Sequence, residues 1–324
     1  MSNRTLLDRY SVLLVALAAM LWASDVYFRN QLVTHLQPSQ IVVAEDALVT
    51  LFLIPILVRS WSDIRRLGPK GWLAVGLIAA GAQALATLLF TASFALAARH
   101  QLFAETFVLQ QTQPLIAILL AWLVLGERRR PWFWPAVLFA LAAVYMVVFA
   151  NDPWSPLSAL KNGRVEVGAL ALGAAALWAS GTVLGRYALD SINFWSVTSL
   201  RFTLALPILV VVVLVQFGAG GFGHYTFTDF VPNLLAIALV PGLFALLLYY
   251  LALSRTPASL ATIAEMAYPV AITLVASAPA PVGFAQPLYP VQLIGTVLLI
   301  AVIVLLNWTK EEAVPVVKPV FEAT

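Results

Sequence analysis

The chain contains no cysteine and few charged residues for its length. Without cysteine it can form neither a disulfide nor a thiolate metal site. Charged side chains account for 10% of the 324 residues, whereas soluble domains average about 25%. Hydrophobic residues make up 62% of the chain. So few charges cannot cover a water-facing surface, and the composition therefore predicts an integral membrane protein.

Sequence motifs of enzymes, pumps and nucleic-acid-binding proteins are missing as well. The histidines, His35, His100 and His224, lie near the ends of apolar runs and form no His-Glu-x-x-His zinc motif. The chain has neither a Gly-x-Ser-x-Gly nucleophile motif nor a Walker loop. We therefore predict that it is not an enzyme and has no cofactor, metal, nucleotide or nucleic-acid partner. A channel stays open as an alternative, which saturable flux and counterflow would separate from a carrier.

Long apolar runs fill most of the chain. A membrane-spanning helix needs about 20 apolar residues. Ten stretches qualify, at residues 11–30, 39–58, 71–98, 102–125, 131–150, 165–188, 195–217, 230–253, 258–278 and 288–308. The connections between them are short, which favours antiparallel helix hairpins and leaves no room for a soluble domain. The predicted fold is therefore an all-α integral membrane protein with ten transmembrane helices.

A seven-residue phrase occurs twice in the chain. Ala-Ala-Met-Leu-Trp-Ala-Ser at 18–24 returns as Ala-Ala-Ala-Leu-Trp-Ala-Ser at 174–180, so that six of seven positions match. Such a repeat indicates two related halves, and transporters are commonly built from such halves with the site between them. The predicted units are a first five-helix repeat at 1–150, a linker at 151–164, a second repeat at 165–309 and a cytoplasmic tail at 310–324.

The Lys and Arg residues predict the orientation. With ten spans both termini lie on one side, and 13 of the 18 Lys and Arg residues fall on that side. The positive-inside rule places that side in the cytoplasm. Because five spans is an odd number, the second half enters the membrane inverted. We expect a monomer or weak dimer in the lipid bilayer of the bacterial cytoplasmic (inner) membrane, with both termini cytoplasmic and a small-molecule substrate.

Trp22 and Trp178 are predicted near the midplane of the membrane. They lie 13 residues past Arg9 and 14 residues past Arg164, which is about 20 Å along a helix. Tryptophan usually prefers the membrane interfaces. Lining of a central cavity and packing among small residues explain the depth of the two rings equally well.

Polar residues occur at matched places in the two halves. Glu265 lies four residues before Pro269, and Gln110 lies four residues before Pro114. Both are expected near the midplane, where a charged side chain costs about 2.5–3.5 kcal/mol. A substrate site shared by both halves would account for them. The alternative is a buried Glu265 that hydrogen-bonds to a neighbouring helix.

Other residues within the spans suit a cavity for aromatic solutes, because rings stack and an amino group can rest on a π face. Prolines in the spans remove backbone hydrogen bonds and permit bending, so they are candidates for hinges or gates. The predicted substrate-binding residues are Trp22, Gln83, Gln110, Trp178, Tyr249, Glu265 and Tyr268. The predicted hinge or gate residues are Pro114, Pro241 and Pro269.

The remaining charges within spans have simpler expected roles. Asp25 and Arg29 are four residues apart, which predicts a surface ion pair near the outer mouth. Glu45, Asp46 and Arg201 fall about a third of the way into their helices, and we expect them to snorkel to the nearer interface.

Three motifs together resemble the drug/metabolite transporter superfamily, of the EamA type, over about residues 12–308. They are the repeated Leu-Trp-Ala-Ser phrase, the turn within Tyr250–Ala261, and Pro114 followed by Leu-Gly-Glu at 125–127. Glu127, with the arginines after it, is expected to end a helix on the cytoplasmic face and to fix topology. The second half departs from the pattern, because Ala280-Pro281-Val282-Gly283 replaces Leu-Gly-Glu.

The resemblance implies two inverted five-helix repeats around a central cavity. It also implies that helices 1, 3, 4, 6, 8 and 9 line the cavity and that helices 5 and 10 pack peripherally. In its richness in aromatic residues the chain resembles the YddG-like branch of the superfamily. This resemblance implies export of aromatic amino acids by alternating access. Since Gln110 cannot titrate, uniport is favoured over proton coupling. Efflux of drugs, organic cations or other metabolites by proton antiport is the alternative.

Overall fold

The computed structural model describes residues 6–100, 109–149, 153–154, 165–227, 229–279 and 287–309. Every regular element in these ranges is a helix. The predicted linker, apart from 153–154, and the predicted tail lie outside the described residues.

Eight helices of the described ranges are long and apolar enough to cross a membrane. They are Leu6–Leu32, Pro38–Arg59, Pro69–Ala97, Val165–Ala188, Phe194–Phe217, Pro232–Leu253, Ala258–Val275 and Pro290–Trp308. Two shorter apolar helices, Gln113–Leu125 and Phe133–Val148, lie where the fourth and fifth spans were predicted. The all-helical membrane fold is therefore confirmed, whereas the structure does not confirm the count of ten full spans.

The first half contains helices that are interrupted within several spans. Its elements are α1 (Leu6–Trp22), α2 (Ser24–Leu32), α3 (Pro38–Arg59), α4 (Trp61–Ile64), α5 (Pro69–Leu77), the π-helix η1 (Ile78–Leu85), α6 (Ala86–His100), α8 (Gln113–Leu125) and α9 (Phe133–Val148). The first span breaks at Ala23, after which the Ser24 hydroxyl donates to the carbonyl of Leu21 at 2.7 Å. This bond satisfies one of the carbonyls left free where α1 ends.

The second half has the same kind of interruptions. Its elements are α11 (Val165–Ala188), α12 (Phe194–Phe217), the short 3₁₀-helix η2 (Ala219–Phe222), the π-helix η3 (Asp229–Leu234), α13 (Leu235–Ile237), the π-helix η4 (Ala238–Phe244), α14 (Ala245–Leu253), α15 (Ala258–Ala264), α16 (Ala267–Ser277) and α17 (Pro290–Trp308). A turn at Glu265 and Met266 separates α15 from α16, and Pro269 follows it. π-helical segments often mark functional sites.

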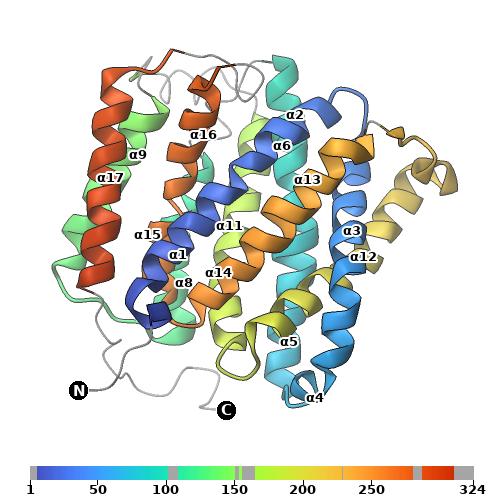
Figure 1. The fold of residues 1–324 in the computed structure, drawn as a ribbon, viewed down its shortest axis with the longest axis horizontal. Helices are drawn as coiled ribbons and strands as arrows, with labels where there is room; N and C mark the ends of the chain where they lie inside the picture. The colour runs from blue at the N-terminus through green and yellow to red at the C-terminus, as the bar shows by residue number, and fades with distance from the viewer. Residues whose placement is uncertain are drawn as a thin grey trace.

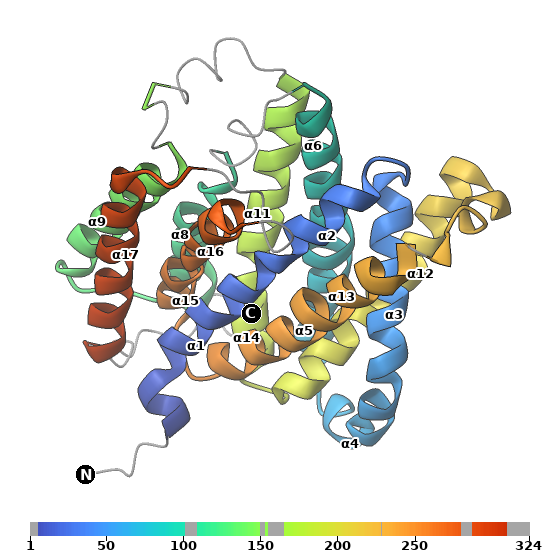
Figure 2. The same ribbon diagram turned by 45° about the horizontal axis from the view of Figure 1, so that its top comes forward.

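The helices are arranged so that sequence-distant elements lie side by side (Figures 1 and 2). At one edge α9 packs against α17, and at the opposite side α3 packs against α12. The contact of α9 with α17 depends on Gly295, where an added Cβ would lie 2.7 Å from the carbonyl oxygen of Ala143. Between these edges α1 packs on α14 and on α16, and α11 packs on α6, η1 and α8. The centre of the bundle is thus built from elements of both halves.

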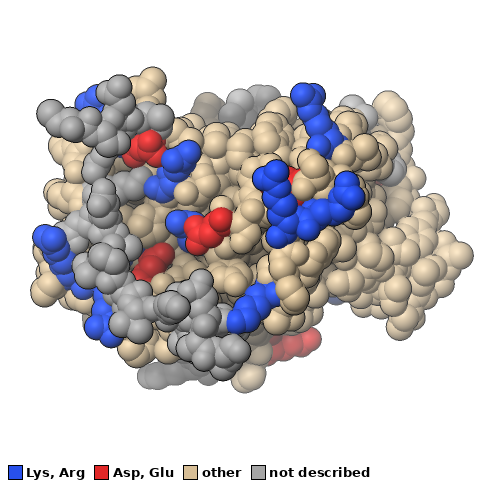
Figure 3. All heavy atoms as spheres, turned by 90° about the horizontal axis from the view of Figure 1, so that it is seen from below, with Lys and Arg blue, Asp and Glu red and all other residues tan. Residues whose placement is uncertain are grey.

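α1 begins and α17 ends on the same face of the molecule, which also carries α4 (Figure 1). Figure 3 shows this face, over which Lys and Arg side chains are spread. Large apolar side chains on the outer faces of α9 and α17, including Leu138, Phe139, Ile294 and Val297, are exposed. Such side chains suit contact with lipid rather than water.

Candidate functional site

A cavity with a volume of about 180 Å³ lies in the centre of the bundle. Its lining comes from elements in both halves. It includes all of the residues that the sequence nominated, namely Trp22, Gln83, Gln110, Pro114, Trp178, Pro241, Tyr249, Glu265, Tyr268 and Pro269. Side chains that the sequence did not nominate for the site complete the lining, among them Asp25, Arg29, Glu45, Phe90, Gln111, Gln113, Thr182 and Arg201.

The two tryptophans of the repeated phrase each pack against a ring from the other half. The ring of Trp22 lies 5.1 Å from that of Tyr249, measured between centroids. The ring of Trp178 lies 5.2 Å from that of Phe90. Because both tryptophans also line the cavity, lining and packing do not exclude each other here.

Glu265 follows the last residue of α15 and is buried, with 8% of its surface exposed. Tyr249 donates its hydroxyl to Glu265 Oε1 at 2.8 Å, and the hydroxyl of Thr182 lies 3.3 Å from the same oxygen. Gln113 of α8 donates to Oε2 at 2.8 Å, so the carboxyl group links the two halves. The expected hydrogen bonds to neighbouring helices are therefore present, on a residue that also faces the cavity.

Gln110 lies in the same cavity, but its surroundings differ from those of Glu265. Its side-chain oxygen is buried and has no hydrogen-bond partner among the described residues. Buried polar atoms normally have partners. Gln110 therefore lines the cavity with a side-chain oxygen that is left without a partner among the described residues.

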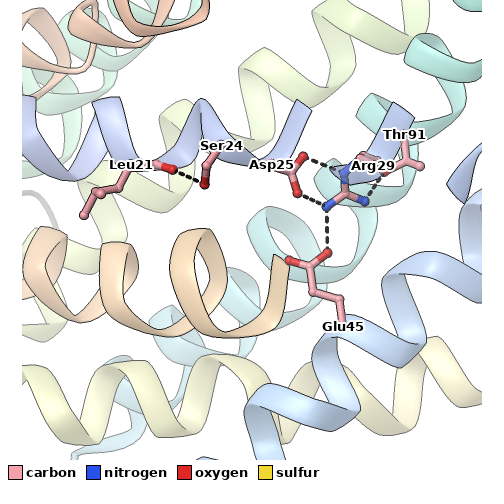
Figure 4. Close-up of polar contacts among 6 residues, drawn as sticks. All are labelled: Leu21, Ser24, Asp25, Arg29, Glu45 and Thr91. Atoms are coloured by element: carbon pink, nitrogen blue, oxygen red, sulfur yellow. Dashed lines mark hydrogen bonds and ion pairs between the residues drawn. The ribbon is translucent and has the colours of Figure 1, made fainter. Parts of the chain in front are cut away.

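Arg29 of α2 is buried in a cluster of acidic and polar side chains (Figure 4). Its Nε and Nη2 atoms donate to the two carboxylate oxygens of Asp25 at 2.6 and 2.7 Å. Nη2 also donates to Glu45 Oε2 at 2.7 Å, and Nη1 donates to Thr91 Oγ1 at 3.1 Å. The predicted pair of Asp25 with Arg29 is present, but its expected place on the surface is wrong, since Arg29 is 3% exposed.

Arg201 of α12 is buried at the cavity wall and pairs with uncharged groups. Nε donates to Gln83 Oε1 at 2.7 Å, and Nη1 donates to the hydroxyl of Tyr250 at 3.0 Å. Gln83 in turn donates its amide to Asp46 Oδ1 at 3.1 Å, and Asp46 is fully buried. The expectation that Glu45, Asp46 and Arg201 snorkel to an interface is therefore wrong, because their partners lie within the bundle.

Glu127 follows Gly126, which ends α8 with a positive φ of 66°. The expected helix end is present, but Glu127 also binds the start of α15. Its carboxylate accepts the backbone N–H groups of Ala258 and Ser259 at 2.8 and 3.0 Å, and Arg129 donates to it at 2.9 Å. Glu127 therefore ties the first half to the second, a role that no local sequence signal indicated.

Sequence reasoning missed Arg29, Glu45 and Arg201 as cavity residues. The available signal was the energetic cost of charge within a span, which calls for partners or a polar cavity. The depth of Glu45 and Arg201 is also compatible with snorkelling, and the spacing of Asp25 and Arg29 is also compatible with a surface ion pair.

Comparison with known proteins identifies the family. A profile described as the EamA-like transporter family matches residues 9–149 and 167–308. The riboflavin transporter ImpX of Fusobacterium nucleatum subsp. nucleatum is 28% identical over 264 residues, which is 80% of this chain and 85% of that protein. A solved crystal structure shares the fold with a TM-score of 0.68 and 20% identity, covering 93% of this chain and 99% of that one. The matched ranges include nearly every described helix, so this multi-pass membrane protein belongs to the EamA-like transporter family.

Proposed function

We propose that the protein is a secondary transporter for small amphipathic solutes with an aromatic ring, most specifically aromatic amino acids. The observation that carries this proposal is the cavity flanked by Trp22 with Tyr249 and by Phe90 with Trp178. Aromatic rings provide stacking area for a solute ring. The few polar groups in an otherwise apolar pocket fix the orientation of its ligand.

Alternating access between two inverted halves is the proposed mechanism. The repeated Trp phrase supports the halves at 1–150 and 165–309, and so does the pair of ranges that the family profile matches. In each half the helix of the fourth span is interrupted by a turn and starts again shortly before Pro114 or Pro269. Rocking of one half against the other around a fixed site is the usual mechanism for such folds, with Pro114, Pro241 and Pro269 as proposed hinges.

The proposed orientation has both termini in the cytoplasm of a bacterial cytoplasmic membrane, and the proposed direction is export down the gradient of the solute. The chain has no cysteine of its own, so single introduced cysteines report the sidedness of each position. Ser62→Cys in α4 should resist an impermeant thiol reagent applied to intact cells, whereas Phe222→Cys in η2 should react. The opposite labelling pattern would overturn the proposed orientation.

Transport is tested by initial uptake into proteoliposomes. The panel contains phenylalanine, tyrosine, tryptophan, riboflavin and an organic cation, each with and without a pH gradient. Saturable uptake with counterflow of at least one aromatic amino acid is expected. Absence of saturable uptake for the whole panel would contradict the proposed function, and flux without counterflow would indicate a channel.

Riboflavin is the second candidate substrate, because a relative with 28% identity is a riboflavin transporter. A flavin also joins an aromatic ring system to a polar chain, which suits the same lining. Uptake of riboflavin without uptake of aromatic amino acids would assign the cavity to the flavin.

The tryptophans test the lining directly. Trp22→Ala and Trp178→Ala should each lower uptake severalfold, since one aromatic contact contributes about 0.5–1.5 kcal/mol. Size-exclusion profiles in detergent serve as the control for folding. Normal uptake by both variants would limit the two rings to packing.

Uniport is proposed because Gln110, in the place that corresponds to Glu265, cannot titrate. Glu265→Gln keeps hydrogen-bonding reach and should retain much of the flux, whereas Glu265→Leu should lose most of it. Uptake by the wild type that is strongly driven by the pH gradient, together with loss of this drive in Glu265→Gln, would instead make Glu265 a proton site.

A further inference from the structure

The guanidinium of Arg201 lines the cavity and forms no ion pair in the part of the chain that the structure describes. Its contacts are the side-chain oxygen of Gln83 at 2.7 Å, the hydroxyl of Tyr250 at 3.0 Å and the carbonyl oxygen of Ala82 at 3.4 Å. A guanidinium has five N–H donors in a planar fork. Two of them are therefore left over, on a side chain that is 9% exposed and faces the cavity.

The position of Arg201 is held from two sides. Gln83 accepts from the guanidinium and donates to Asp46, so the side-chain amide is oriented by both contacts. The centre of the guanidinium also lies 5.9 Å from the centroid of the Tyr250 ring. Arg201 is thus kept in the bundle without an ion pair that would occupy its free donors.

Arg29, the other guanidinium in the cavity wall, is not available in this way. Four of its five N–H groups donate hydrogen bonds to Asp25, Glu45 and Thr91. Two of these three partners are carboxylates. A solute carboxylate at Arg29 would have to compete with two buried acidic side chains. The anion-binding capacity of the cavity therefore lies at Arg201.

Glu265 is the acidic counterpart of Arg201. Its carboxyl group is bound by the neutral donors Tyr249, Thr182 and Gln113, and no described Lys or Arg forms an ion pair with it. Tyr249 and Tyr250, which contact Glu265 and Arg201 respectively, are consecutive residues of α14. Beside its aromatic rings, the cavity thus presents one guanidinium and one carboxyl group that form no ion pair among the described residues.

This arrangement matches the charges of an amino acid with an aromatic side chain. We propose that Arg201 binds the carboxylate of the transported solute through its free N–H groups, while the amino group donates a hydrogen bond to the side-chain oxygen of residue 265, which glutamine would also provide. The proposal rests on the proposed function and names the specificity-determining contact within that site. Planar guanidinium–carboxylate pairing provides both charge and directional hydrogen bonds.

The experiment compares tryptophan with tryptophanamide, in which a neutral amide replaces the carboxylate. Proteoliposome uptake of each compound is measured for the wild type, Arg201→Gln, Arg201→Lys and Arg255→Gln. Arg255 is a matched control, since it is half exposed and pairs with Asp8 away from the cavity. A hydrogen bond to a charged group contributes about 1.5–3 kcal/mol, or roughly tenfold or more in affinity.

Arg201→Gln should therefore lower uptake of tryptophan about tenfold and uptake of tryptophanamide much less. Tryptophan uptake by Arg201→Lys should be intermediate between that of Arg201→Gln and that of the wild type. Glu265→Gln alters the other end of the solute and should leave the preference for the carboxylate in place. Equal losses for both compounds in Arg201→Gln would reduce Arg201 to a structural role and overturn the proposal.

A competition assay on the wild type needs no variant to fold. Tryptophanamide should inhibit uptake of labelled tryptophan about tenfold more weakly than unlabelled tryptophan does. Equal inhibition by the two compounds would overturn the proposal while leaving the proposed function intact. Transport of neither compound by folded wild-type protein would instead contradict the proposed substrate class.

Discussion

Arg29 and Arg201 are both buried guanidiniums in the wall of one cavity, yet their surroundings are opposite. Arg29 contacts two carboxylates, whereas Arg201 contacts an amide, a hydroxyl and a carbonyl. Charges within a membrane are costly unless they are paired or serve a binding function. The charge of Arg29 is thus balanced by carboxylates within the protein, whereas Arg201 keeps N–H groups that we propose bind the carboxylate of the solute.

The ion pairs of Arg29 also connect several elements. Asp25 belongs to the same helix, Glu45 to α3 and Thr91 to α6. Breaking a buried pair leaves an uncompensated charge, which costs more than the pair itself contributes. The cluster of Arg29 is therefore expected to determine stability, and the cluster of Arg201 to determine which solute is bound.

The largest expected effect is on stability, in Arg29→Leu. Removal of the guanidinium leaves Asp25 and Glu45 without a cation and should cost about 3–5 kcal/mol. Thermal unfolding in detergent and the yield of monodisperse protein measure the loss. The triple variant with Asp25→Asn and Glu45→Gln removes the stranded charges and should recover much of it. Wild-type stability of Arg29→Leu would contradict the assignment of this cluster to stability.

The second prediction concerns a double variant that gives Arg201 a carboxylate partner, as Arg29 has. The double variant Asp46→Asn with Gln83→Glu exchanges the acid and the amide, so the formal charge is unchanged and Arg201 gains a carboxylate partner. The protein should stay folded but lose tryptophan uptake about tenfold, since the new partner competes with the solute carboxylate. Unchanged uptake would mean that free donors on Arg201 are not required. Asp46→Asn alone is the matched control.

The smallest expected effect concerns a third polar contact, between His35 and Asp229 outside the spans. His35 Nε2 lies 2.5 Å from Asp229 Oδ1, with the His35 side chain 48% exposed. Burial alone would raise the pKa of Asp229, but hydrogen bonds from the backbone N–H of Thr226 and from His35 outweigh it and lower that pKa. A lowered pKa contributes stability above the unfolded-state value near 4, and the contribution is lost as the pH falls through the folded-state value.

Asp229→Asn should therefore lower the melting temperature slightly at pH 7, by an amount that corresponds to about 1 kcal/mol or less. It should also flatten the decline of stability between roughly pH 5 and pH 3. Melting temperatures of both proteins across this range test the sign. A steeper decline in Asp229→Asn than in the wild type would contradict the lowered pKa.

Several features of the site could be predicted from the sequence because helix geometry converts residue number into depth. A rise of about 1.5 Å per residue places Trp22, Trp178, Gln110 and Glu265 at similar depths, and the structure brings all four to the same cavity. Helix breaks near Pro114 and Pro269 also follow from local chemistry, since proline lacks the N–H that continues a helix. Composition predicted the membrane class, and the length of the apolar runs predicted the all-helical fold.

Only the tertiary structure decided the direction in which each side chain points and the residue that it contacts. Arg201 hydrogen-bonds to Gln83 at a sequence separation of 118 residues, and Gln113 hydrogen-bonds to Glu265 at a separation of 152 residues. Lipid and protein interior are similarly apolar, so a membrane helix carries little sequence signal for which face is buried. Depth was therefore predictable from the sequence, whereas the different partners of Arg29 and Arg201 arise from how the helices of the two halves pack together.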